Sequence, residues 1–150
     1  MKLETVREAY MRAETIYNTA CTMEKGPERD RLIDQARALH DTTCAEVNAC
    51  GPVFADVAGI YYKSMNRGNV VPDIDHSPYN ATPAEVVAIF RENGIKRFTM
   101  SSTWTDATKT AWAFIEAGCR LDGMQTVFIN EVNFWTDEYK TGPALVFYID

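Results

Sequence analysis

Apolar residues in the first part of the chain recur at alternating spacings of three and four. The members of this first set are Leu3, Val6, Tyr10, Ala13, Tyr17 and Ala20. Such spacing is typical of the seam of a helix that packs against another helix. Gly26-Pro27 interrupts the pattern, and proline is well tolerated at the first position of a helix. The pattern predicts one helix over residues 2–25 and a second helix from residue 28.

The second helix carries a seam of the same spacing, which keeps its phase across Gly51-Pro52. Its members are Ile33, Ala36, His40, Thr43, Val47 and Cys50, followed by Phe54, Val57 and Tyr61. A proline inside a helix removes one hydrogen bond and clashes with the preceding turn, so the helix either kinks at Pro52 or restarts there. The two long helices match in length as an antiparallel hairpin. We expect the segment after Pro52 to dock the hairpin onto the rest of the chain.

The remainder of the chain mixes helical and extended patterns. Residues 66–80 lack periodicity and contain Gly and Pro, so a linker or surface loop is predicted. Thr82-Pro83-Ala84-Glu85 is a capping box, which begins a helix that ends near Asn93. A strand over 95–100 precedes a helix that begins among Ser101–Thr105 and ends before Gly118. A further strand over 119–132, with a turn or bulge at Asp122-Gly123, a loop over 136–143 and a closing strand over 144–149 complete the chain.

This order predicts an α+β protein. Its N-terminal part is an antiparallel helical hairpin with a kinked second helix, packed on a small C-terminal α-β-α-β-β module. The predicted boundaries are 1–68 for the hairpin and the docking helix, 69–81 for a linker and 82–150 for the α/β module. The helical seam serves equally well within one chain or between two copies, so a homodimer is possible.

Composition narrows the class of protein. Among 150 residues, 46% are hydrophobic and 24% are charged, which is typical of a globular protein. The charged N-terminus has no signal-peptide pattern, and no apolar run approaches the length of a membrane span. We therefore expect a cytoplasmic protein without membrane association. The four cysteines lack paired CxxC spacing, which favours reduced, buried thiols and no disulfide.

The net charge of −6 is concentrated in the second half of the sequence. After residue 68 the chain has eleven acidic and six basic residues. This excess argues against direct contact with nucleic acid, because phosphate contacts need basic groups. It suits a partner protein with a basic face, although solubility alone also explains an acidic surface.

Few residues suggest catalysis or metal binding. Asp73, Asp75 and His76 could form part of a metal site, but they are too few, and Asp in such loops is an ordinary turn former. His40 and Cys44 could form half of a zinc site, but no second pair exists. Known catalytic motifs are absent. We predict a protein without catalytic residues, metal or cofactor.

Two other groups of residues are candidates for binding. Ser101, Ser102, Thr103 and Thr105 lie at a predicted helix N-terminus, where backbone N–H groups favour an anion, although helix capping also explains these hydroxyls. The second group is an aromatic and acidic segment that follows a predicted strand. Its members are Phe134, Trp135, Asp137, Glu138 and Tyr139. Exposed aromatic residues are common at interface hot spots, so this segment is the predicted partner-binding site, with packing on the core as the alternative.

The C-terminal half, from the helix at Thr82 through Gly94–Trp104 to Ala117-Gly118-Cys119, resembles a family of small uncharacterised accessory proteins. Members of that family are encoded on plasmids, conjugative elements and phages of gut Firmicutes. The resemblance implies an accessory protein of a mobile element, and many such proteins inhibit host defence, anti-CRISPR proteins among them. It brings no catalytic residues.

The leading hypothesis is therefore a non-enzymatic protein that binds and inhibits a host defence factor, for example a CRISPR effector, through its acidic and aromatic C-terminal face. The alternative hypothesis is a small-ligand or nucleotide-binding sensor or enzyme that uses the Ser101–Thr105 helix N-terminus as an anion site.

Overall fold

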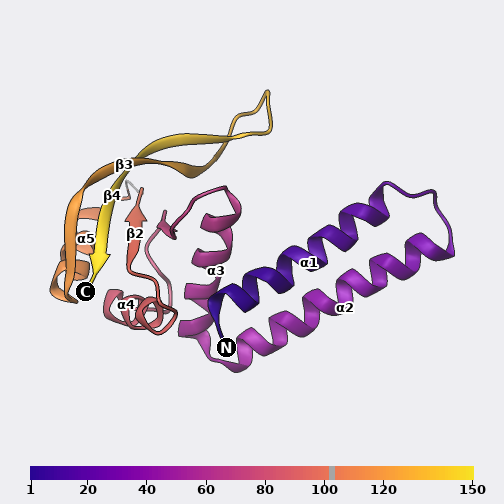
Figure 1. Cartoon of the computed structure of the whole chain (residues 1–150), viewed down its shortest axis with the longest axis horizontal. Helices are drawn as coiled ribbons and strands as arrows, with labels where there is room; N and C mark the ends of the chain where they lie inside the picture. Colours follow the sequence, from indigo (N-terminus) through magenta and orange to yellow (C-terminus); the bar gives the residue numbers. More distant parts are fainter. Residues whose placement is uncertain (102–103) are drawn as a thin grey trace. The chain divides into compact units, whose positions relative to one another are not determined.

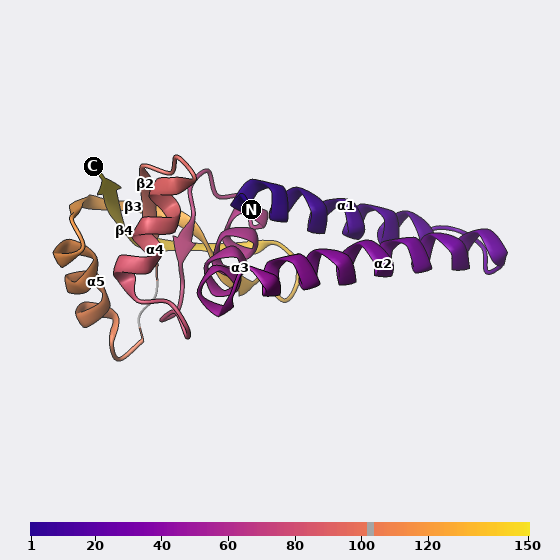
Figure 2. The ribbon, with the colours of Figure 1, turned by 90° about the horizontal axis from the view of Figure 1, so that it is seen from below.

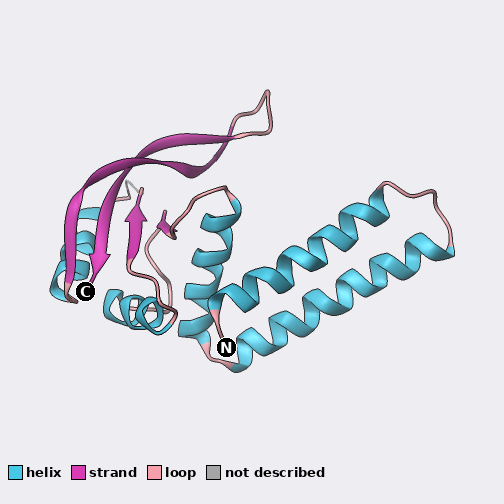
Figure 3. Ribbon diagram, viewed as in Figure 1, coloured by secondary structure: helices cyan, strands magenta, loops and turns pink. Residues whose placement is uncertain are grey.

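Helices make up the N-terminal part of the chain, and the strands lie in its C-terminal part (Figures 1 and 3). The computed structural model describes residues 1–101 and 104–150. The described residues form five helices and one four-stranded mixed sheet, which confirms the predicted α+β class. The chain divides into two compact units, Met1–Gly51 and Pro52–Asp150.

The first unit is an antiparallel pair of helices, α1 (Leu3–Cys21) and α2 (Pro27–Ala49), as predicted (Figures 1 and 2). The buried residues of this hairpin are Leu3, Val6, Ala13, Ala20, Ala36, Thr43 and Val47. The seam is narrower than predicted, because Tyr17, His40 and Cys50 are exposed. Small side chains let the two helices lie close together but bury little apolar surface.

The helix restarts at Pro52 and is not continuous through a kink. Helix α2 ends at Ala49, and α3 begins at Pro52 and ends at Asn66. Gly51 between them has a φ of +97°, a left-handed conformation that interrupts a right-handed helix. Within the second unit α3 packs against β1, α4 and β3. A docking role for α3 between the two units stays a prediction.

The sheet of the second unit has the strand order β1-β2-β4-β3. Its strands are β1 (Asp73–Ile74), β2 (Arg97–Met100), β3 (Cys119–Val132) and β4 (Tyr139–Ile149). Strand β1 pairs in parallel with β2, and the other pairs are antiparallel. The predicted α-β-α-β-β order is observed from α4 onward. Strand β1 lies in the segment that we predicted to be a linker or surface loop, and that prediction was wrong for Asp73 and Ile74, which are buried.

The two helices of this unit are α4 (Pro83–Glu92) and α5 (Ala107–Glu116). The capping box at Thr82 and Glu85 is present with both of its hydrogen bonds. Helix α5 begins later than predicted, because its N-cap is Asp106. Ser102 and Thr103 lie outside the described residues.

Four phenylalanines form the centre of the second unit. Phe98 of β2 stacks on Phe147 of β4 with ring centroids 5.2 Å apart and planes 14° from parallel. Phe90 of α4 and Phe114 of α5 lie 5.5 Å and 4.9 Å from the same Phe98 ring. Successive side chains of a strand point to opposite faces, so contact with one ring means that both helices cover the same face of the sheet.

Strands β3 and β4 form a long hairpin whose outer half extends past β2 and curves over the end of α3 (Figure 1). The predicted bulge is present, with a register shift between Leu121 and Met124 and a φ of +76° at Gly123. The loop expected over 136–143 is shorter, because β4 already begins at Tyr139 and pairs with Val132. The turn of the hairpin therefore consists of residues 133–138, which we call the hairpin tip.

All four cysteines are free thiols, but the prediction that they are buried is correct only for Cys119. Cys21 and Cys50 are exposed, and Cys44 is half-buried. In the described part of the chain, no helix combines the length and the apolar character that crossing a membrane requires.

Candidate functional site

The hairpin tip carries the two most exposed of the large apolar side chains. Phe134 is 87% exposed and Trp135 is 90% exposed, and the two rings meet edge to face with centroids 5.7 Å apart. Neither ring packs on the core, which was the alternative interpretation of the sequence. Tyr139, at the start of β4, is 41% exposed.

Hydrogen bonds within the tip define its backbone conformation. Asn133 donates its N–H to the Glu138 carbonyl at 2.7 Å and accepts the Asp137 N–H at 3.0 Å. The side-chain oxygen of Asn133 accepts the Trp135 N–H at 2.9 Å. Asp137 has a φ of +56°, which Asp tolerates better than most residues. The aromatic pair is therefore carried by a closed turn.

The charge around the tip is mainly acidic. Asp137 and Glu138 are exposed. Farther down the hairpin, Lys140 forms an ion pair with Glu131 at 2.9 Å across the two strands. The carboxylates of Asp137 and Glu138 thus flank the aromatic pair. The five residues that the sequence predicted as partner-binding lie together at this end of the hairpin.

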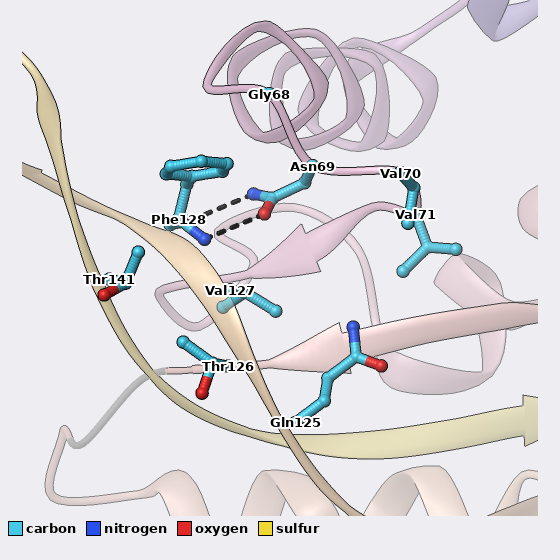
Figure 4. A pocket seen from close by; sticks show the side chains of 9 residues that line it. All are labelled: Gly68, Asn69, Val70, Val71, Gln125, Thr126, Val127, Phe128 and Thr141. Atoms are coloured by element: carbon cyan, nitrogen blue, oxygen red, sulfur yellow. Dashed lines mark hydrogen bonds between the residues drawn. The ribbon is translucent and has the colours of Figure 1, made fainter.

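A side chain clamps the middle of the hairpin to the loop after α3 (Figure 4). The Asn69 amide donates to the Phe128 carbonyl and accepts the Phe128 N–H, each at 2.9 Å. The same carbonyl accepts Arg67 Nε at 3.2 Å. Asn69 thereby takes the place of a neighbouring strand at one position of the edge strand β3.

The clamp requires a glycine next to it. Gly68 has a φ of +103°, and a Cβ atom built there would lie 3.2 Å from the Phe128 ring. Phe128 therefore packs against backbone, and the clamped segment borders a small pocket of about 260 Å³ between residues 68–71 and 125–128 (Figure 4). We call Gly68, Asn69 and Phe128 the hairpin clamp.

A buried polar network lies beside the clamp. The Arg67 side chain is 2% exposed, and its two Nη atoms contact Asp73 at 3.3 Å and Asp75 at 3.4 Å. Asp73, which is fully buried, also accepts the hydroxyls of Thr99 at 2.6 Å and Ser101 at 2.5 Å. The network joins the end of α3 to the parallel strands β1 and β2.

Burial raises the pKa of Asp73 above its ordinary value, because the charged carboxylate loses its hydration. Hydrogen bonds from Ser101 and Thr99 and the charge of Arg67 oppose this rise, while Asp75 adds to it. Asp73 and Asp75 thus share the buried guanidinium of Arg67. The hydroxyls of Thr99 and Ser101 supply the other hydrogen bonds of Asp73.

The network ends in a pocket at the carboxyl ends of β1 and β2. Asp75 and His76 follow β1, and Ser101 follows β2. These residues line an open pocket of about 750 Å³, whose lining also includes residues 129–131 and 142–143 of the hairpin. His76 Nδ1 contacts the Asp75 carboxylate, and its ring lies 5.5 Å from that of Tyr79. Ligands of α/β proteins commonly bind outside the carboxyl ends of parallel strands.

Two of the four residues that were predicted to form an anion site, Ser101 and Thr105, lie within the described part of the chain. Ser101 lines the pocket and donates its hydroxyl to Asp73. Thr105 is exposed in the turn before α5, and Ser102 and Thr103 lie outside the described residues. An anion site at 101–105 stays a prediction.

This network could not be predicted from the sequence. Asp73, Asp75 and His76 were predicted to lie in a turn, and no role was predicted for Arg67 or Asn69. A strand of two residues is too short for a periodic pattern, so nothing in the sequence placed β1 beside β2. Within the ranges 1–101 and 104–150, no group of three His, Cys, Asp or Glu side chains is arranged to hold a metal ion.

Comparison with known proteins identifies a family. A family model described as "Domain of unknown function (DUF7698)" matches residues 56–149, which is nearly all of the second unit. No curated protein matches the chain. No solved structure matches it either.

Proposed function

Because the chain belongs to the family described as Domain of unknown function (DUF7698), a description that assigns no activity, we propose a function from the geometry. The chain is a non-enzymatic protein-binding module. Its hairpin tip inserts Phe134 and Trp135 into an apolar depression on a partner protein. The observation that carries this proposal is the exposure of both rings, 87% and 90%, on a closed turn.

Burial of these rings supplies the driving force for binding. A large aromatic side chain buries roughly 150–250 Å² in an interface, which at about 25 cal/mol per Å² is about 4–6 kcal/mol for each ring before the costs of association. Trp and Tyr are also the residues in which binding energy tends to concentrate. Trp135 is therefore expected to contribute most of the affinity.

The acidic charge of the tip indicates which residues should surround the depression on the partner. Asp137 and Glu138 flank the rings, and residues 69–150 carry five more acidic than basic groups. Opposite charge around an interface speeds association and excludes wrong partners. The partner is expected to present an apolar depression surrounded by Lys and Arg.

The resemblance seen in the sequence supplies the class of partner. Accessory proteins of mobile elements often inhibit host defence, so we propose that the partner is a host defence factor, with a CRISPR effector as one example. Inhibition would follow from direct binding and would need no catalytic residue.

Affinity capture from a lysate of the host bacterium tests the proposal. The wild-type chain and a double variant, Phe134→Ala with Trp135→Ala, are immobilised and the captured proteins are quantified. We expect the double variant to lose a protein that the wild type retains.

Trp112→Ala is the matched control, because Trp112 is another exposed tryptophan, 62% exposed on α5 and distant in sequence from the tip. This variant should retain the partner. Equal capture by the wild type and the double variant would contradict a binding role for the tip.

A further inference from the structure

His40 and Cys44 lie one turn apart on α2, and both have side chains that bind metal ions. Cys44 Sγ lies 3.7 Å from His40 Nδ1 and 4.0 Å from His40 Nε2. A sulfur and a nitrogen that bind the same tetrahedral zinc ion lie about 3.6 Å apart, because Zn–S and Zn–N bonds are about 2.3 Å and about 2.0–2.1 Å long. The two side chains are therefore close enough together to bind one ion.

The packing of the helical hairpin leaves both side chains accessible. The sequence predicted His40 to lie in the seam between the two long helices, but its side chain is 58% exposed. Cys44 is half-buried at the edge of the same seam. The exposed His40 ring can therefore turn toward an ion held by Cys44 without disturbing the packing of α1 against α2.

Two neighbouring side chains suit the pair to a metal site. The hydroxyl oxygen of Tyr10 lies 3.2 Å from Cys44 Sγ, where it can donate a hydrogen bond to a metal-bound thiolate. The Asp41 carboxylate lies 3.6 Å from His40 Nδ1. A histidine that binds zinc through one nitrogen commonly donates the proton of the other nitrogen to a carboxylate or carbonyl. Asp41 is within reach of this contact when Nε2 binds the metal.

One chain supplies only half of the ligands that such a site needs. Structural zinc sites have four ligands. Over residues 1–101 and 104–150, no third His, Cys, Asp or Glu side chain is arranged to complete the pair. In a twofold-symmetric dimer the same surface is presented by both copies. A second copy therefore supplies a second His40 and a second Cys44, which gives two sulfur and two nitrogen ligands.

The surface beside the pair is suited to contact with a second copy. On α2, Ile33 precedes His40 by seven residues, and on α1, Tyr17 follows Tyr10 by seven. Residues seven apart lie on the same face of a helix. Tyr10 contacts Cys44, and its ring lies 5.3 Å from that of His40, so the two faces lie on the same side of the hairpin. Tyr17 is 50% exposed and Ile33 is half-buried, which leaves apolar surface there for a second hairpin to cover.

We propose that two copies of this chain bind one zinc ion through His40 and Cys44 of each copy. Each Cys44 thiol releases its proton to solvent, and the ion accepts a lone pair from each sulfur and from one nitrogen of each imidazole. Zinc is the divalent ion that a tetrahedral set of two thiolates and two imidazoles favours. This site lies in the first unit and does not depend on the function of the hairpin tip. Zinc binding there would correct the sequence-based prediction of a protein without metal.

Sedimentation equilibrium of the full chain with and without zinc chloride, in the presence of a non-thiol reductant, tests the proposal. The mass of the wild type should double when zinc is added and should return to that of the monomer when the zinc is chelated. Isothermal titration calorimetry should give one zinc ion for two chains. Cobalt in place of zinc should give the intense visible absorption of a tetrahedral, thiolate-bound ion.

His40→Ala and Cys44→Ser should each lose the zinc-dependent dimer, because each substitution removes two of the four ligands. Cys44→Ser retains a polar group beside Tyr10, and circular dichroism checks that the helices of each variant are intact. His76→Ala and Cys50→Ser are the matched controls, because they replace the other histidine of the chain and an exposed cysteine. Both controls should dimerise with zinc like the wild type.

An unchanged mass in the presence of zinc would overturn the proposal, as would a dimer that forms equally well without zinc. Binding of one zinc ion to each chain would also overturn it. So would a zinc-dependent dimer in either His40→Ala or Cys44→Ser, or an equal loss of the dimer in the two controls. If Cys44→Ser does not fold, His40→Ala, at an exposed position, decides alone.

Discussion

Both ends of the β3–β4 hairpin carry large aromatic side chains, but these side chains are buried at one end and exposed at the other. At the base, Phe147 is fully buried among three other phenylalanines, and Cys119 and Ile149 are buried beside it. At the tip, Phe134 and Trp135 touch each other and are almost fully exposed. Folding accounts for the apolar residues at the base, but it does not account for those at the tip. The tip is therefore where binding is expected.

The boundary between these two ends is the hairpin clamp. Asn69 bonds both backbone groups of Phe128, about midway along the hairpin. Beyond this point the β3 side chains are half-buried or exposed, and the strands are held by their own pairing. The clamp thus fixes the outer half of the hairpin to the second unit without adding to its core.

The largest expected effect is at the base. Phe147→Ala removes a fully buried ring that stacks on Phe98, so it should lower the free energy of unfolding by about 3–5 kcal/mol. Phe134→Ala, the same substitution at the tip, should change it by less than about 0.5 kcal/mol. Urea denaturation of both variants measures the difference. Similar losses would contradict the distinction between the two ends.

A smaller effect is expected at the clamp. Asn69→Ala removes the side-chain acceptor of the exposed Phe128 N–H, at a cost of about 0.5–1.5 kcal/mol. Amide hydrogen exchange should become faster around Phe128, while exchange around Phe147 stays slow. Asn130→Ala, a substitution of the same type at an exposed position of β3, is the control. Unchanged exchange at Phe128 in Asn69→Ala would show that the clamp does not hold the hairpin.

The reactivity of Cys119, the thiol at the start of β3, measures how well the base of the hairpin is buried. This measurement needs no substitution. Burial raises the pKa of Cys119 to about 11, so near pH 8 this thiol should react with iodoacetamide far more slowly than the exposed Cys21 and Cys50. A pKa raised from 9.0 stabilises the fold below pH 9, and this contribution is lost as the pH rises through 11. Mass spectrometry of the labelled peptides measures the rates. Equal labelling of all three cysteines would show that the base is open.

The sequence predicted much of the second unit because its signals are local. The capping box at Thr82, the bulge at Gly123 and the order of elements after α4 each depend on neighbouring residues. The apolar pattern keeps its phase across Gly51-Pro52, yet α2 ends at Ala49 and Gly51 has a left-handed φ of +97°. The periodic pattern could not distinguish a kink from a restart.

The two candidate sites also differ in whether local sequence signals could predict them. The aromatic pair at 134–135 could be predicted because it directly follows a strand. The network of Arg67, Asp73 and Ser101 could not, since it depends on a parallel pairing between strands of two and four residues. Contacts such as Asn69 with Phe128, 59 positions apart, leave no periodic pattern in the sequence.

The smallest expected change in stability accompanies the largest expected change in binding. The double variant Phe134→Ala with Trp135→Ala should unfold within about 0.5 kcal/mol of the wild type, because neither ring packs on the core. Its affinity for the captured partner should fall by at least about 2 kcal/mol, which is roughly thirtyfold.

Titration calorimetry of the purified partner against the wild type and this double variant is therefore the most direct measurement. The account predicts a loss of at least about thirtyfold in affinity with unchanged folding. Equal affinities would contradict the proposal that the tip is the binding surface.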